Sequence, residues 1–444
     1  MRTRTSTQWR RRLLGSAVLC TVVGLAACSA AAGGGGSMGP TSGKITLTLW
    51  VDGAISGSPE VPAQVKNFEA AHPGVTINTV VEPSGNYFAT LQAALIAGHA
   101  PDIVSLYAGS YLNTIDPYLQ NLDASGQAIS SAALAKVPDE AVWTQSGTLS
   151  SGTYAVPESE QFYNGYYNKA LFKKAGITAL PQTWTQLYSA CTKLKAAGVT
   201  PIVYGNDGNG GEFWPLAEWS YLLAGATSLS SWNGFLDGKQ SYDSPAMVAQ
   251  LTDWAKLYQS GCTNSDALND STNQSEFEHG KAAMIIEGSW DTPIFQPYLG
   301  SNLGVFLPPY SSSGKQMIVE LAGQGFGIPK SSPDKALAEE FLASILTSSG
   351  QNALVKTGQI PIYQGYSMPA VSAQLLQAAS EKSYQVYPMF DNYMQQSVAS
   401  VADKELDQAF VGQISPSTAL QNIETAVQDL PSAQRSATYP LGSQ

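Results

Sequence analysis

Side chains that could do catalytic chemistry are few in this sequence and follow no catalytic motif. The three histidines, His72, His99 and His279, all lie at turn-like positions. Neither a G-x-S-x-G nucleophile elbow nor a G-x-x-x-x-G-K-[ST] phosphate loop occurs. The 34 acidic residues could supply paired carboxylates, but no motif singles out a pair. The sequence therefore indicates no catalytic triad, no nucleotide site and no enzyme activity.

Metal-binding patterns are also missing. No C-x-x-C or Cys/His spacing suggests zinc. The stretch Asp207–Gly211 resembles a calcium loop but lacks the later ligands, so we interpret it as a flexible loop. We expect neither a metal nor a cofactor.

Cys28 ends a segment whose order of residue types is typical of an export signal. Five arginines precede the 15 apolar or small residues 13–27. As a helix, those 15 residues would span roughly 22 Å, less than the roughly 30 Å of a hydrocarbon core. A removable signal is therefore favoured. The run Leu-Ala-Ala-Cys at its end resembles a bacterial lipobox, which implies lipidation of Cys28, and residues 28–43 read as a flexible tether.

We therefore expect an exported protein, anchored by lipid to the outer face of the cell membrane. An ordinary secretory signal is the alternative, and the arginine run also resembles a twin-arginine signal weakly. Cys191 and Cys262 remain after the signal is removed. An oxidising compartment permits a disulfide between them, although two separate buried thiols would also fit.

Composition bounds the remaining chain. A length of 444 residues predicts two domains. An apolar content of 43% is enough to form a hydrophobic core in each. Loss of the signal arginines lowers the formal charge from −11 to −16. Because nucleic acids require a basic surface, so acidic a protein is not expected to bind them. Nothing after residue 43 is apolar for long enough to span a bilayer.

The first part of the mature chain alternates strands and helices. Strands are predicted at 44–50, 75–81 and 102–106, and helices at 62–71 and 87–97, which favours a parallel sheet covered by helices. Asp52 and Tyr107 follow two of these strands, at the carboxyl edge where open α/β sheets bind ligands. The later chain reads similarly, with helices at 169–175, 183–197, 244–259 and 334–346. It ends in a helical tail at 371–380, 393–410 and 417–428.

Short sequence blocks spread over nearly the whole mature chain carry a family resemblance. They include Phe68–Val75, Ala97–Val104, Tyr154–Pro157, Gly165–Lys169, Phe277–Met284 with Glu287–Trp290, and Gly323–Ile328. In this order and spacing, the chain resembles the family 1 extracellular solute-binding proteins, the sugar-binding lipoproteins of ABC importers, similar to maltose-binding protein.

The resemblance implies an α/β fold of type II, in which two lobes joined by a hinge enclose a ligand cleft and a helical tail follows. It places the chain crossings near 159–164, 320–326 and 358–364. The N-terminal lobe would comprise 44–159 plus 327–358, and the C-terminal lobe 160–320 plus 360–444. Both remaining cysteines would then share the C-terminal lobe.

The same resemblance implies a carbohydrate ligand, and with it a set of contact residues. Aromatic rings stack on the apolar faces of sugars, and carboxylates and amides bind the hydroxyls. Trp290 is the first choice for stacking, followed by Trp214 and Tyr393. The polar candidates are Gln161, which stands where maltose-binding protein has an acidic contact, and also Asp52, Tyr107, Gln324 and Glu287.

The expected function is capture of a carbohydrate between the lobes and its delivery to the transmembrane subunits of an ABC permease. Two alternatives stay open at this point. One is an extracellular hydrolase acting on glycans, and the other is a binding protein that serves sensing rather than uptake.

Overall fold

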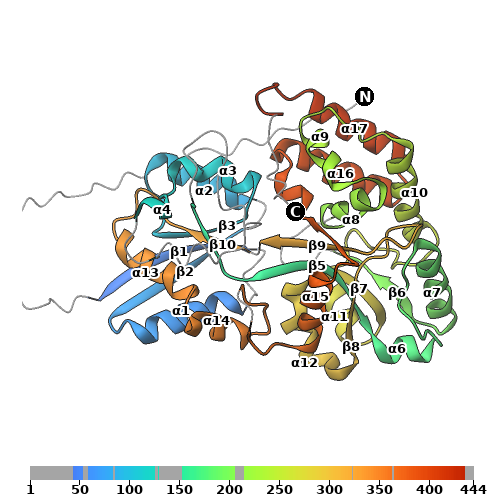
Figure 1. The fold of residues 1–444 in the computed structure, drawn as a ribbon, viewed down its shortest axis with the longest axis horizontal. Coiled ribbons are helices and arrows are strands. Elements are labelled where there is room, and N and C mark those ends of the chain that lie inside the picture. Colours follow the sequence, from blue (N-terminus) through green and yellow to red (C-terminus); the bar gives the residue numbers. More distant parts are fainter. Residues whose placement is uncertain are drawn as a thin grey trace, which may run out of the picture. The chain divides into compact units, whose positions relative to one another are not determined.

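The strands that the structure describes form two separate sheets (Figure 1). The computed structural model describes residues 44–53, 59–83, 86–125, 129, 153–205, 215–322, 324–362 and 365–435. Cys28, the tether and Trp214 lie outside the described residues. Within those ranges, every helix is too short or too polar to cross a membrane.

The first sheet has the strand order β2-β1-β3-β10-β4. Its strands are β1 (Ile45–Asp52), β2 (Val75–Glu82), β3 (Ile103–Leu106), β10 (Gly325–Gly327) and β4 (Val156–Pro157). β1 pairs in parallel with both β2 and β3, which confirms the sheet predicted from the strand–helix alternation. β10 is antiparallel to β3 and β4, and it comes more than 200 residues after β3 in the chain.

Helices cover both faces of this sheet. Because neighbouring strand residues point to opposite faces, Ile103 packs into one apolar cluster and Val104 into the other. The first cluster also holds residues of α1 (Glu60–Ala71) and α13 (Lys335–Ile345), and the second holds α2 (Tyr87–Ala97). Figure 1 shows α13 and α14 (Ser348–Val355), in orange, beside the blue elements of the chain's beginning.

The second sheet has the order β11-β9-β5-β7-β6, with β8 also paired to β5. Its strands are β5 (Glu160–Asn168), β6 (Thr200–Val203), β7 (Ala282–Gly288), β8 (Leu303–Phe306), β9 (Met317–Ala322) and β11 (Gln385–Pro388). The pairs β6–β7 and β9–β11 are parallel, whereas β5 is antiparallel to its three partners. The sequence did not predict the short strands β8, β9 and β11, because runs of four to six residues give little periodic signal.

Capped helices surround the second sheet. Thr183 and Ser244 accept a hydrogen bond from the third residue after them, so they cap α7 (Trp184–Ala196) and α10 (Pro245–Gln259) as their sequence positions suggest. The remaining helices of this part are α6 (Lys169–Lys174), α8 (Leu216–Ala226), α9 (Trp232–Leu236), α11 (Asn273–Glu278), α12 (Thr292–Leu299), α15 (Ala370–Ser380), α16 (Gln396–Phe410) and α17 (Pro416–Gln428).

One helix prediction was too long. The helix expected at 393–410 begins only at Gln396, because Met394 and Gln395 are extended. A short 3₁₀ turn, η7 (Phe390–Tyr393), precedes it. The predicted periodicity was right for the helix itself, whose buried side chains recur along one face.

In the part of the chain that the structure describes, the backbone passes between the two sheets three times. It leaves the first sheet after Pro157 and enters the second at Glu160. It returns between Ala322 and Gly325. The third passage follows α14, where the backbone of Ile360 pairs with that of Glu160. The result is the two-lobe α/β fold that the sequence predicted.

Candidate functional site

Asp52 and Tyr107 lie at the carboxyl edge of the first sheet, as predicted. The backbone N–H of Asp52 donates to the hydroxyl of Ser105, 3.1 Å away, which ties the ends of β1 and β3 together. Burial raises the pKa of the Tyr107 phenol, and the carboxyl of Asp52 raises it further. The rings of Phe88 and Tyr111 lie 5.8 and 5.6 Å from that of Tyr107, so an aromatic group borders this edge.

Four polar side chains meet where the chain passes between the sheets, and we name them the crossing cluster: Glu60, Glu158, Gln324 and Gln359. Each comes from the start of α1 or from one of the three passages. The amide of Gln324 donates to Glu158 Oε1 at 2.6 Å, and the amide of Gln359 donates to Glu60 Oε2 at 3.2 Å. All four are almost completely buried. Gln324 is thus on a passage, where the sequence predicted it, and Glu158 flanks the predicted Gln161, whereas Glu60 and Gln359 were not predicted.

The crossing cluster reaches the predicted stacking residue directly. Besides its bond to Glu60, the amide of Gln359 donates to the backbone oxygen of Trp290 at 3.1 Å. Glu60 belongs to the first lobe and Trp290 to the second. One side chain therefore contacts both lobes at the passage between them.

Trp290 is held at the end of β7 by its neighbours. It lies in a 3₁₀ turn, η5 (Ser289–Asp291), and the Ser289 hydroxyl accepts the N–H of Phe162 at 3.0 Å. Its half-buried ring lies over Gly288, where any Cβ would overlap the ring. The Tyr163 ring is 6.1 Å away at an interplanar angle of 37°. Because the ring is half-buried, part of it remains available for contact.

Gln161 and Glu287 lie on the strands beside this tryptophan. Gln161 is buried in β5, in register with Leu321 of β9, and the half-buried Glu287 pairs with Asn164 across β5 and β7. Burial, followed by the charges of Glu218 and Glu287, raises the pKa of Tyr163. Glu287 is therefore close to the aromatic pair that Tyr163 forms with Trp290.

Tyr393 lies where the two lobes touch at a second place. Its ring packs against the cores of both lobes. Nearby, the amide of Gln396 donates to the hydroxyl of Ser110 at 3.0 Å, and Gly109 lies against the backbone of Asn392. Gly109 has φ of 71°, and a Cβ there would overlap the Asn392 oxygen, so glycine is required twice over. Tyr393 thus bridges the lobes, which makes packing one of its roles.

The predicted cysteine pair is buried in the second lobe. Both side chains are described as free thiols, and they are in hydrogen-bonding contact with each other, which raises the pKa of Cys191. The disulfide stays a prediction. Among the described residues, no three His, Cys, Asp or Glu side chains are grouped so that they could hold a metal.

Comparison with known proteins decides the family. The model of the family described as "Bacterial extracellular solute-binding protein" matches residues 55–352. This chain is a member of that family. The match covers the first two passages between the sheets and all of their strands except β1 and β11.

Relatives and solved structures agree with that assignment. The galactooligosaccharide-binding protein of Bacillus subtilis is 23% identical over 92% of this chain and 95% of its own length. The sn-glycerol-3-phosphate-binding periplasmic protein UgpB of Escherichia coli is 25% identical over 63% of this chain and 64% of its own. A putative binding protein of Brucella abortus is 28% identical, but this chain spans only 58% of its length.

The fold itself is well represented. A solved chitin oligosaccharide binding protein superposes with a TM-score of 0.69 over 87% of this chain and 98% of its own, at 24% identity. Maltose-bound MalE3 of T. maritima gives 0.69 over 86% and 99%, at 20% identity. At these identities, the likeness establishes the two-lobe fold of this solute-binding protein.

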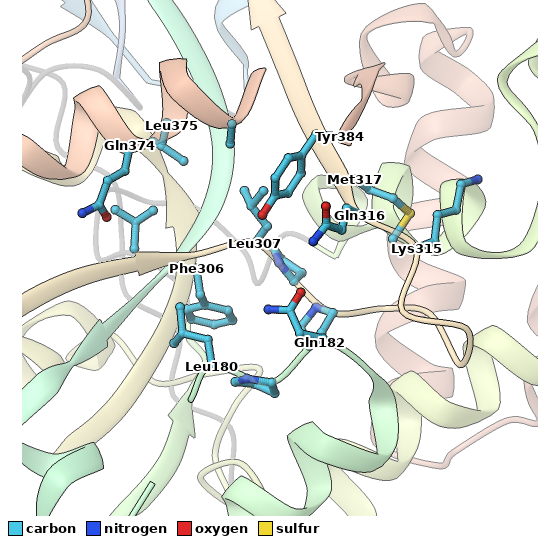
Figure 2. A pocket seen from close by; sticks show the side chains of 15 residues that line it. Leu180, Gln182, Phe306, Leu307, Lys315, Gln316, Met317, Gln374, Leu375 and Tyr384 are labelled. Carbon is cyan, nitrogen blue, oxygen red and sulfur yellow. The ribbon is translucent and has the colours of Figure 1, made fainter. Parts of the chain in front are cut away.

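A pocket of about 180 Å³ opens elsewhere in the second lobe (Figure 2). Gln182, the end of β8 near Leu307, the start of β9 and Tyr384 line it. It shares no residue with the predicted site. Its volume is below the roughly 300 Å³ at which pockets for drug-sized ligands begin, so we do not place the ligand there.

Sequence reasoning missed Glu60, Gln359 and Tyr163. Glu60 lies outside the matched sequence blocks, and Gln359 follows a glycine at an unpaired stretch with no periodic signal. Tyr163 sits two residues after the predicted Gln161, inside a nine-residue strand that is buried almost throughout. A strand buried on both sides shows no alternation that would mark one side chain as facing a ligand.

Proposed function

We propose that this solute-binding protein captures a carbohydrate and delivers it to the permease of an ABC transporter. The observation that carries the proposal is the position of Trp290. Its half-buried ring lies at the end of β7, and its backbone oxygen accepts a hydrogen bond from Gln359 of the crossing cluster, at the passage between the lobes. Relatives named for galactooligosaccharide or chitin oligosaccharide binding support the same ligand class.

The residues supply the two kinds of contact that a sugar needs. Trp290, with Tyr107 and Tyr393 on other elements, offers flat apolar faces for the C–H surfaces of the ring. Gln161, Gln324, Asp52 and Glu287 offer acceptors and donors for hydroxyl groups. Trp214 belongs to the same proposed set. None of these contacts requires the sugar to react, so the proposed role is binding without turnover.

Capture would proceed by closure of the two lobes on the ligand. We assign the lobes to 44–159 plus 327–358 and to 160–320 plus 360–444, so that all three passages lie at their boundary. Closing the lobes buries the sugar and removes competing water. We further propose that Cys28 carries a lipid anchor on the outer face of the membrane, which raises the local concentration of the protein near the permease.

The test is a screen of oligosaccharides by thermal shift and titration calorimetry, followed by two substitutions of one residue. Trp290→Phe keeps a flat ring, whereas Trp290→Leu keeps apolar bulk without one. We expect Phe to retain most of the ligand-induced stabilisation and Leu to lose at least tenfold in affinity, about 1.4 kcal/mol.

Tyr298→Ala removes an aromatic ring that is 60% exposed in α12, and it should bind like the wild type. Equal affinity of the Phe and Leu variants would exclude Trp290 as the stacking face. Release of shorter sugars from any glycan by the purified protein would replace the binding role with a hydrolase.

A further inference from the structure

A contact between the lobes lies apart from the three passages, and we name it the interlobe contact. On the first lobe it is made by residues 109–111, which follow β3 and begin the helix α3 (Ser110–Ile115). On the second lobe it is made by residues 391–396, which run from η7 into the start of α16. Because neither segment belongs to a passage, the contact can form and break as the lobes rotate about the passages.

Gly109 lies so close to the second lobe that no side chain could take its place. A Cβ there would be 2.1 Å from the backbone oxygen of Asn392 and 2.8 Å from its carbonyl carbon. Since ordinary van der Waals contact begins at 3.4 Å, the two backbones would have to separate by about 1 Å. The overlapping atoms of Asn392 belong to the backbone, so no side-chain rotation relieves the overlap.

Two further interactions join the same segments. The amide of Gln396 donates to the hydroxyl of Ser110 at 3.0 Å. Burial raises the pKa of the Tyr111 phenol, and the charge of Asp391 raises it further, so this phenol lies near a carboxyl of the other lobe. Three consecutive residues of the first lobe, 109–111, therefore each interact with the second.

The interlobe contact adjoins two residues of the proposed sugar site. On the first lobe, the ring of Tyr111 lies 5.6 Å from that of Tyr107. On the second lobe, Tyr393 directly follows Asn392 and packs against the cores of both lobes. Formation of the contact thus fixes how far apart two of the proposed stacking rings lie, one from each lobe.

We propose that the interlobe contact is a latch for the closed arrangement of the lobes, and that Gly109 is a positioning residue that raises affinity without touching the sugar. The latch stabilises the arrangement in which both lobes reach the ligand, and the measured affinity falls in proportion when fewer molecules adopt it. Every sugar should therefore depend on Gly109 to the same extent. This inference rests on the proposed function, capture by closure, and adds a residue that controls the closure.

Gly109→Ala and Gly98→Ala form a matched pair that tests the latch. Both glycines belong to the first lobe and both have φ of 71°, so alanine strains the two backbones alike. A Cβ at Gly98, which follows the end of α2, would meet nothing within 4 Å. Any difference between the two variants therefore comes from the overlap with the second lobe.

Titration calorimetry and small-angle X-ray scattering supply the measurements. The probes are a galactooligosaccharide and β-1,4-linked N-acetylglucosamine oligomers of two lengths, because two similar proteins are named for such ligands. We expect Gly109→Ala to bind each sugar at least tenfold more weakly than Gly98→Ala does, with the ratios among the sugars unchanged. Without sugar, Gly109→Ala should also have the larger radius of gyration, because fewer of its molecules have closed lobes.

A second variant keeps the test open if Gly109→Ala does not fold. Gln396→Ala removes only the hydrogen bond to Ser110, so it should weaken the binding of all the sugars by one smaller factor. In that case, unchanged affinity of Gln396→Ala would overturn the inference.

Three results with the matched pair would overturn it as well. These are equal affinities of the two glycine variants, equal radii of gyration, or a loss of affinity that differs among the sugars, since Gly109 would then act at the sugar itself. If no sugar of the panel binds the wild type, the proposed function is wrong, whereas the radii of the two variants still show whether the interlobe contact holds the lobes closed.

Discussion

Glu218 offers a prediction whose size follows from its surroundings. This carboxyl lies in the first turn of α8, and its side chain is buried in the core of the second lobe. The indole N–H of Trp254 donates to its Oε2 at 3.2 Å, and the Tyr310 hydroxyl donates to the same oxygen. Burial raises the pKa of Glu218 from 4.5 to about 7, although these hydrogen bonds lower it in part.

The shift makes stability depend on pH in a definite direction. Below about pH 4.5, the carboxyl is protonated in both states and its contribution is complete. Between pH 4.5 and 7, only the folded state keeps the proton, so the free energy of unfolding falls as pH rises. A shift of this size at about 1.4 kcal/mol per unit corresponds to a loss of about 3 kcal/mol, which is complete above pH 7.

The measurement compares the wild type with Glu218→Gln by urea unfolding between pH 4 and 8. Other buried acids titrate as well, but they contribute equally to both proteins and cancel in the difference. We expect the free energy of unfolding of the variant, relative to that of the wild type, to rise by about 3 kcal/mol between pH 4 and 8, with the change confined to pH 4.5–7. A difference that stays constant over this range would show that Glu218 is ionised in the folded protein.

Two further predictions concern the tryptophan and the cysteines. Gly288→Ala places a methyl group against the Trp290 ring. We expect it to lower the free energy of unfolding by about 1–3 kcal/mol in urea unfolding, and to weaken sugar affinity about tenfold in titration calorimetry. Unchanged affinity would mean that the position of the ring does not matter for binding. Oxidation of Cys191 and Cys262 outside the cell should close a loop of about 70 residues and stabilise the protein by about 4 kcal/mol. When the protein is denatured without a reducing agent, neither of these two cysteines should then react with an alkylating reagent. Labelling of both thiols would contradict the disulfide.

The sequence predicted those parts of the fold that are periodic and local. The helix near 244–259 and the strands β1 and β3 follow from a few neighbouring residues, and the structure has them in the predicted places. A general rule on strand ends gave the positions of Asp52 and Tyr107 at the ends of β1 and β3, and their contact with a ligand stays a prediction. Short buried strands such as β8 could not be predicted in this way, because four apolar residues fit a strand or a helix equally well.

The crossing cluster shows why Glu60 and Gln359, unlike Gln324, could not be predicted from the sequence. Glu60, Glu158, Gln324 and Gln359 are separated by up to about 300 residues, and each is unremarkable beside its own neighbours. These side chains come together only because β10 pairs with β3 and because the third passage runs beside β5. Judged from its own sequence segment, each carboxyl would be expected at the surface, where its charge stays hydrated. The burial of Glu60 and Glu158 depends on the amide donors of Gln359 and Gln324, which come from the other two passages.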